Sequence, residues 1–231
     1  NTDMYREVLR APSCFIWFGC MMLTATTELA PGQWVDVALS NMVGMPGIVV
    51  LIYVSALMFV MRHFAGRIVE HIPPVGLLWF SSLFAMIGLY LLSVVNTPVL
   101  VFVAATVWGV GVCYMYPTMV ASASERYPRG GAFIMGIMGF AAGMAIQFVL
   151  PIMGAIYDEA CVAAAGGAEA LSELAGEELV AVTRLASTES FQAVAIIPAL
   201  LLPIFALIWW ADRRKAAAGG AGSRETGREQ C

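Results

Sequence analysis

Long apolar runs separated by short polar segments dominate the pattern of this chain. Six such runs cover approximately residues 13–37, 46–64, 75–95, 99–122, 130–156 and 190–211. An α-helix needs about 20 apolar residues to cross the roughly 30 Å hydrocarbon core of a bilayer, and each run reaches or nearly reaches that length. The pattern therefore predicts an all-α, polytopic protein whose core is a bundle of six transmembrane helices.

The polar segments predict what lies outside the bilayer. Residues 1–12 form an amphipathic lead that is typical of a short interfacial helix. Residues 158–189 are acidic and rich in alanine, and a surface helix is expected over 168–185 because apolar positions recur there at Leu171, Leu174, Leu179 and Val182. Residues 212–231 are basic and then rich in Gly, Ala and Ser, which predicts a disordered tail.

Prolines lie inside several of the apolar runs, and in two of these runs they predict an interruption. Pro31-Gly32 predicts a break in the first run, which is expected to end near Val37. Pro198 and Pro203 predict kinks in the last run.

Composition agrees with a membrane protein. Of the 231 residues, 60% are hydrophobic and only 12% are charged, whereas soluble domains have about 25% charged residues. The five cysteines show no metal-binding or redox spacing, so neither a metal site nor a disulfide is predicted. The chain contains none of the common nucleotide-binding or hydrolase motifs, so we expect no enzyme activity, no cofactor and no nucleic-acid partner.

The positive charges are distributed unevenly. If the gaps between runs alternate between two sides, all of the twelve Lys and Arg residues except Arg184 fall on the side of the two termini. Cytoplasmic loops carry an excess of Lys and Arg, so a multi-pass protein of the cell membrane with both termini in the cytoplasm is expected. The acidic segment is then outside.

Thr24–Trp34 is the most polar stretch inside an apolar run. It contains Thr24, Glu28, Gln33 and Trp34. An ionisable group at membrane depth costs roughly 2.5–3.5 kcal/mol on insertion scales and usually faces a protein interior or a water-filled path. These residues are therefore candidates for a solute or proton path. The alternative is a Glu28 satisfied by nearby threonines, with Trp34 as an interfacial aromatic.

Three further groups of residues are functional candidates. Tyr114 and Tyr116 could line the same path or pack against other helices, and Gln147 leaves the same two alternatives open. Arg62, Gly66 and Arg67 could form a gating latch, and the alternative is plain anchoring at a positively charged membrane face.

Glycines and the distribution of polar residues predict how the helices pack. Gly109 and Gly111 allow a close approach of helices, and Gly139–Gly143 is a GxxxG motif that favours a tight crossing. The third and sixth runs hold few polar residues and are expected to face lipid. The first, second, fourth and fifth runs are then expected to line a cavity.

Several stretches resemble the C-terminal six-helix half of a major facilitator superfamily transporter. The resemblance is carried by YREVLRAPSCFIWF, by FAGRIVEHIPP as a relic of the signature cytoplasmic loop, and by GVGVCYMYPTMVASASERYPRGGAFIMGIMGFAAGM followed by PIMGAIYD. TELAPGQW is similar to the seventh helix of fucose-permease-like and other sugar-type members. The loop lacks an aspartate before Arg67 and lacks a second Gly-Arg pair.

This resemblance implies two six-helix halves with a solute site between them and alternating access by rocking. It also implies that the first and fourth helices line the cavity, the second and fifth form gating interfaces, and the third and sixth face lipid. The expected partners are a small polar solute, with a sugar as first candidate, a proton as coupling ion, the lipid bilayer and an N-terminal six-helix half. The alternative, from a different class, is a complete six-span protein with a structural or assembly role.

Overall fold

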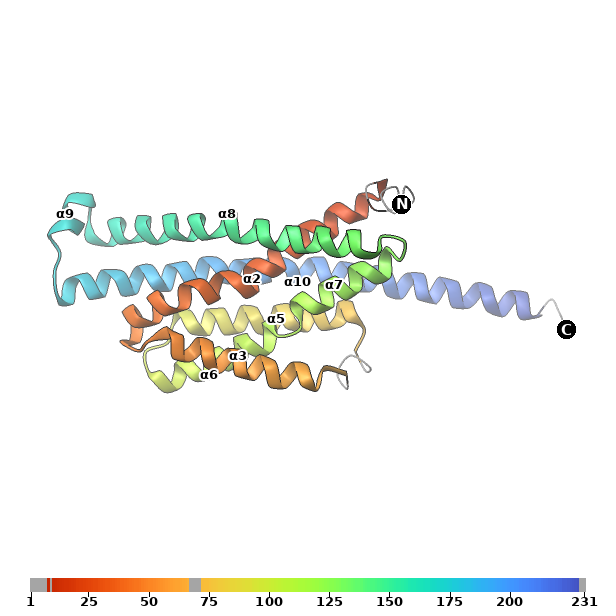
Figure 1. Ribbon diagram of the computed structural model, residues 1–231, viewed down its shortest axis with the longest axis horizontal. Coiled ribbons are helices and arrows are strands. Elements are labelled where there is room, and N and C mark those ends of the chain that lie inside the picture. Colours follow the sequence, from red (N-terminus) through yellow and green to blue (C-terminus); the bar gives the residue numbers. More distant parts are fainter. Residues whose placement is uncertain (1–7, 9, 67–71, 229–231) are drawn as a thin grey trace.

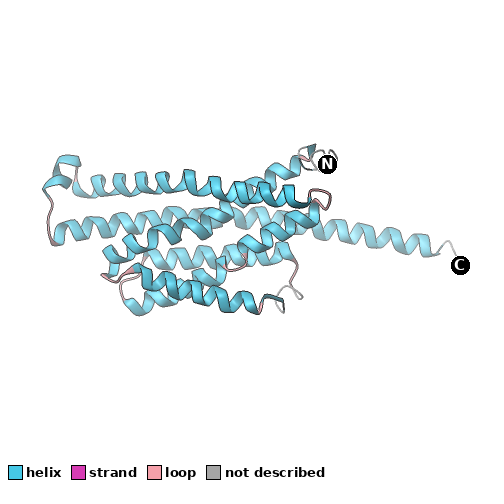
Figure 2. Ribbon diagram, in the orientation of Figure 1, coloured by secondary structure: helices cyan, strands magenta, loops and turns pink. Residues whose placement is uncertain are grey.

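The computed structural model describes Val8, residues 10–66 and residues 72–228. Within these ranges the chain is mostly helical, with short loops and turns, and contains no strand (Figure 2). The helices are α2 (Pro12–Val43), α3 (Gly47–His63), α5 (Pro74–Ser93), α6 (Pro98–Val112), α7 (Met115–Arg126), α8 (Gly131–Ala165), α9 (Ala168–Glu173) and α10 (Glu177–Arg228). The prediction of an all-α protein is confirmed.

Local sequence explains where several helices begin and end. Proline is the first residue of α2, α5 and α6, where its missing N–H costs nothing and its fixed φ suits a helix. The Thr97 hydroxyl accepts a hydrogen bond from the Leu100 amide at 3.4 Å and caps α6. Gly44 ends α2 in the left-handed region, with φ 68°, which a residue without Cβ adopts at low cost.

The described helices include five that are long and apolar enough to cross a membrane. They correspond to α2, α5, the α6–α7 pair, α8 and α10, while α3 is apolar but only 17 residues long. The protein is therefore membrane-embedded by length and composition.

The helices run side by side along the long axis of the molecule (Figure 1). The start of α2, the turn between α7 and α8, and the end of α10 lie at one end, and the connections from α2 to α3, α5 to α6 and α8 through α9 to α10 lie at the other. We call the first the basic end, because described basic residues lie there: Arg62 and Arg126 in the last turns of α3 and α7, Arg129 between α7 and α8, and Arg213, Arg214 and Lys215 directly after the apolar part of α10. Contacts of α10 with α5, α2 and α8, and of α3 with α2 and α6, hold the bundle together.

The predicted break at Pro31-Gly32 is wrong. α2 continues through Pro31 and ends only at Val43, beyond the predicted end near Val37. A proline inside a helix removes one hydrogen bond and can be tolerated where a neighbouring helix satisfies the freed group. Pro198 and Pro203 likewise lie inside the single helix α10.

The polar segments near the C-terminus also differ from prediction. The surface helix expected over 168–185 is divided, because α9 ends at Glu173 and α10 begins at Glu177. The tail expected to be disordered from Asp212 continues α10 as far as Arg228. Extending an existing helix is far easier than nucleating one, and the alanines from Ala216 favour it.

The third run has an exposed apolar stripe, formed by Phe80, Phe84, Ile87 and Tyr90, as expected of a helix with few polar residues, but its other faces are buried in the bundle. α5 packs on α6, α7 and α10, and its Ser81, Ser82 and Ala85 are buried. A Cβ on Gly88 would lie 2.3 Å from the Trp108 nitrogen, and one on Gly111 would lie 2.3 Å from the Ala85 nitrogen. Small residues thus bring α5 and α6 into backbone contact, as predicted for Gly111.

The GxxxG motif of α8 behaves in the opposite way. Gly139 and Gly143 are exposed, and a Cβ on either would meet nothing within 4 Å. The tight crossing predicted for them is therefore absent from the described part of the chain. Spacing shows that two glycines share a face, but it does not show that another helix covers that face.

Candidate functional site

Two prolines free two backbone carbonyls near the middle of the bundle. Proline has no N–H, so the carbonyl four residues before it loses its helical hydrogen bond. Pro31 frees the Thr27 oxygen, which accepts a hydrogen bond from the Trp108 indole N–H at 3.4 Å. Pro117 frees the Cys113 oxygen at the interruption between α6 and α7. Side chains from other helices donate hydrogen bonds to both carbonyl oxygens.

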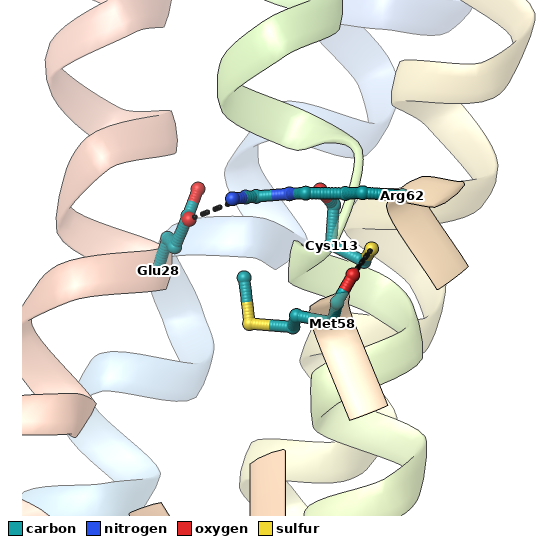
Figure 3. Close-up of polar contacts among 4 residues, drawn as sticks. All are labelled: Glu28, Met58, Arg62 and Cys113. Atoms are coloured by element: carbon teal, nitrogen blue, oxygen red, sulfur yellow. Dashed lines mark hydrogen bonds and ion pairs between the residues drawn. The ribbon is translucent and has the colours of Figure 1, made fainter. Parts of the chain in front are cut away.

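Arg62 completes the second carbonyl and also forms an ion pair. Its Nε donates to the Cys113 oxygen at 2.9 Å, and its Nη2 lies 3.1 Å from Glu28 Oε1. Figure 3 shows Arg62 reaching from α3 toward Glu28 on α2. One guanidinium therefore connects α2, α3 and the α6–α7 interruption. A pair of residues within a single helix could not join three segments in this way.

The remaining polar groups of α2 around Glu28 are incompletely satisfied. Glu28 Oε2 and Thr24 Oγ1 are buried and have no hydrogen-bond partner among the described residues. The two residues are four apart and lie on the same face of the helix. Buried polar groups are nearly always paired, so two unpaired oxygens on one face of α2 mark this as an unusual part of the bundle.

A cavity of about 420 Å³ lies beside the ion pair. Its lining includes Arg62, Tyr114, Tyr116 and Pro117, from α3 and from both sides of the α6–α7 interruption. The Tyr114 hydroxyl donates to the Met61 oxygen at 2.6 Å, so this ring is held against α3. Arg62 retains 44% exposure of its side chain, compared with 12% for Glu28, because it faces this opening.

Two further contacts fix α3 against α6. The Tyr53 and Thr106 hydroxyls are 2.7 Å apart, and the Cys113 thiol donates to the Met58 oxygen at 3.6 Å (Figure 3). The Tyr53 ring also packs edge-on against Phe102. The position of Arg62 is therefore set by a supported helix.

The structure brings together some of the predicted site residues. Thr24, Glu28, Arg62, Tyr114 and Tyr116 lie around the ion pair and its cavity. Arg62 belongs to the last turn of α3, and not to a flexible loop.

The other predicted residues are not part of this group. Gln33, Gly66 and Gln147 are exposed and absent from the cavity lining. The side chain of Trp34 and the whole of Arg67 lie outside the described residues. Gln147 was predicted from polarity alone, and α8 turns it away from Glu28 because its helical phase is set by Ile134, Met138 and Ala145.

Sequence reasoning missed the Cys113 oxygen and Trp108. A backbone oxygen has no residue type of its own, but its availability is encoded by Pro117 four residues later. The same rule applied to Pro31 identifies Thr27. The two prolines were thus the signal that could have located both acceptors.

No cluster of three or more metal-ligating side chains occurs in the described residues. No family model matches the chain, and no match was found among curated proteins or solved structures. The geometry around Glu28 and Arg62 is therefore the basis for assigning a function.

Proposed function

We propose that this chain is one six-helix half of a secondary transporter of the major facilitator type. The proposed cargo is a small polar solute, with a sugar as first candidate and a proton as coupling ion. The observation that carries the proposal is the Glu28–Arg62 ion pair beside a cavity of about 420 Å³, with one carboxylate oxygen unpaired. Ionisable residues inside membrane bundles usually mark such paths.

The contacts of Arg62 suggest how the site could respond to cargo. Arg62 holds α2 through Glu28 and the α6–α7 interruption through Cys113. A proton on Glu28, or a solute hydroxyl that competes for Oε1, weakens the first contact and leaves the second in place. α2 is then freed relative to α3 and α6, which is the kind of change that alternating access requires.

The proposed topology counts α3 as a sixth span. Its 17 apolar residues are near the lower limit for crossing a bilayer, and it packs beside α2 and α6. The basic end is then assigned to the cytoplasm of the cell membrane, with both termini there. A further six-helix half would cover the exposed faces of α3 and α8.

Reconstituted uptake by the full-length protein tests this function. Wild type and Glu28→Gln would be compared in proteoliposomes over a panel of sugars and other small polar solutes, with and without a pH gradient. Glu28→Gln keeps the side-chain shape and removes its charge, so gradient-driven accumulation should be lost. Glu178→Gln, at an exposed position in the first turn of α10, is the matched control. Unchanged pH-driven accumulation in Glu28→Gln would exclude the proposed coupling role.

A further inference from the structure

A second cleft, of about 370 Å³, opens at the basic end between α5, α7 and α10. Pro74 contributes from α5, Ser122, Glu125 and Arg126 from α7, and Trp209, Asp212 and Arg213 from α10, so two carboxylates line the cleft beside the two arginines. Glu28, Arg62 and Tyr114 are absent from its lining. It adjoins the candidate solute cavity, with which it shares Pro74 and Glu125, but it excludes the ion pair, and the inference drawn from it does not depend on transport.

The cleft lies where three apolar spans end. The α5 span begins at Pro74, the α6–α7 span ends at Arg126, and in α10 two tryptophans are followed by Asp212, Arg213, Arg214 and Lys215. Tryptophan followed by basic residues is typical of the interface between hydrocarbon and water. This is the depth at which the phosphates of a bilayer lie.

Arg213 presents unpaired donors to the cleft. Its guanidinium lies over the Trp209 ring, 4.5 Å from the centroid, and within the described part of the chain it forms no ion pair. Arg126 differs, because Asp212 neutralises it. Trp209 itself is held closely, since a Cβ on Gly76 would lie 3.3 Å from its Cζ2 atom. The arginine is thus oriented by stacking and keeps its hydrogen-bond donors available.

Ser122 supplies a second and independent indication of a ligand. Its residue is only 3% exposed, and it lines the same cleft. Its hydroxyl has no hydrogen-bond partner among the described residues. By comparison, Ser124 on the same helix donates to the Val120 oxygen at 2.9 Å. A buried hydroxyl left unpaired beside a positively charged group matches an anionic oxygen.

We propose that this cleft binds the phosphate group of a membrane phospholipid. The Arg213 guanidinium and the Ser122 hydroxyl donate hydrogen bonds to the phosphate oxygens. Trp209 and the first turn of α5 form the apolar wall against which the glycerol backbone and the start of the acyl chains pack. Basic pockets between transmembrane helices bind phospholipid headgroups by this chemistry.

Lipid titration of the full chain in detergent, followed by native mass spectrometry, tests the proposal. The probes are phosphatidylglycerol and a galactosyl diacylglycerol, which has the same acyl chains and no phosphate. Phosphatidylglycerol should bind at least about 10-fold more tightly than the galactolipid, since charge-assisted hydrogen bonds are the strong ones. Equal binding of the two lipids would overturn the proposal.

Two pairs of variants locate the site. Arg213→Gln should weaken phosphatidylglycerol binding about 10-fold, and Ser122→Ala about 3-fold. Arg214→Gln and Ser124→Ala are the matched controls and should change it less than about 2-fold, because neither residue lines the cleft, Arg214 stacks on Trp210 with its guanidinium 3.6 Å from the ring centroid, and Ser124 is already paired. If Arg213→Gln does not fold, the Ser122→Ala and Ser124→Ala pair decides. Equal losses within a pair would show general surface attraction and refute the site.

Inorganic phosphate distinguishes a lipid from a free anion. At 1–10 mM, on the order of intracellular levels, it should leave phosphatidylglycerol bound, because the apolar wall adds affinity that only a lipid can use. Full displacement of the lipid by phosphate in this range would assign the cleft to a soluble anion and overturn the lipid proposal.

Discussion

The carbonyls freed by Pro31 and Pro117 are completed in contrasting ways. The Thr27 oxygen accepts from Trp108, a neutral donor that is 3% exposed and has no alternative partner in view. The Cys113 oxygen accepts from Arg62, a charged donor that is shared with Glu28 and faces a cavity. The same backbone defect therefore produces a fixed joint between α2 and α6 in one case and a contact that can respond to ligand in the other.

The difference between them lies in the donor. An indole has a single N–H, so a Trp108 that leaves Thr27 must leave a buried group unpaired. A guanidinium has five, so Arg62 can keep the Cys113 oxygen while it exchanges Glu28 for another acceptor. We therefore expect changes around Arg62 to affect uptake and changes around Trp108 to affect stability.

Arg62→Ala should have the largest effect on uptake. It leaves Glu28 without its counter-charge and the Cys113 oxygen without its donor, at a cost of about 2–3 kcal/mol to the active arrangement. That cost corresponds to a roughly 30- to 150-fold lower rate of uptake per folded molecule. Initial rates in proteoliposomes, normalised to folded protein, measure it.

Two controls accompany the Arg62 measurement. Arg62→Lys restores the charge but cannot donate to both acceptors from a planar fork, so it should recover only part of the rate. Arg62→Ala alone should lower the free energy of unfolding relative to wild type. The double variant Arg62→Ala with Glu28→Gln should lower it by a smaller amount. Additive effects on stability would show that the two side chains do not interact.

Pro117→Ala should have the second largest effect. The new N–H at position 117 can bond the Cys113 oxygen within the helix, so α6 and α7 are expected to join and compete with Arg62. An approximately 10-fold loss of uptake is expected, about 1.4 kcal/mol, with equal or higher stability. Amide hydrogen exchange over residues 113–118 should slow at the same time. Faster exchange there would contradict the assignment of the interruption to Pro117.

Sequence patterns predicted which segments of this protein are helical better than they predicted what packs against each helix. Apolar runs reveal helices because every backbone group in lipid must be bonded internally. Lipid tails are as apolar as leucine, however, so side-chain polarity cannot distinguish a helix face covered by lipid from one covered by another helix. This is why the composition of α5 indicated its exposed stripe but not the buried face on which Gly88 and Gly111 join it to α6, and why Gly139 and Gly143 were expected to be covered.

The charged part of the candidate site was predictable from the sequence. Glu28 stood out because a carboxylate in an apolar run needs a partner, and its partner proved to be Arg62, one of the residues predicted for a gating loop. The sequence could not pair them, because they are 34 residues apart and the chain between them includes a helix reversal whose angle depends on packing. The Cys113 oxygen, a backbone atom, is visible in the sequence only through Pro117.

Trp108→Phe should lower stability and leave uptake nearly unchanged. The ring is largely kept, but the Thr27 oxygen loses its donor in a buried position, which costs about 1–3 kcal/mol. The free energy of unfolding in mixed micelles measures the loss, and uptake per folded molecule should stay within about 2-fold of wild type. Phe102→Leu, at a partly buried position in the same helix, is the comparison for lost aromatic packing alone. A large loss of uptake in folded Trp108→Phe would remove the distinction between the two joints.

Pro31→Ala should have the smallest effect of the four variants. The new N–H at position 31 can bond the Thr27 oxygen along α2, so the long indole contact of 3.4 Å becomes redundant. We expect unchanged uptake and a change in unfolding free energy of less than about 1 kcal/mol, because one weak hydrogen bond replaces another. The variant also sharpens the contrast with Trp108→Phe. In the double variant the helix itself completes the carbonyl, so the loss caused by Trp108→Phe should shrink by about 1 kcal/mol or more. If the loss of unfolding free energy stays the same, the indole stabilises the bundle through packing and not through its hydrogen bond to the Thr27 oxygen.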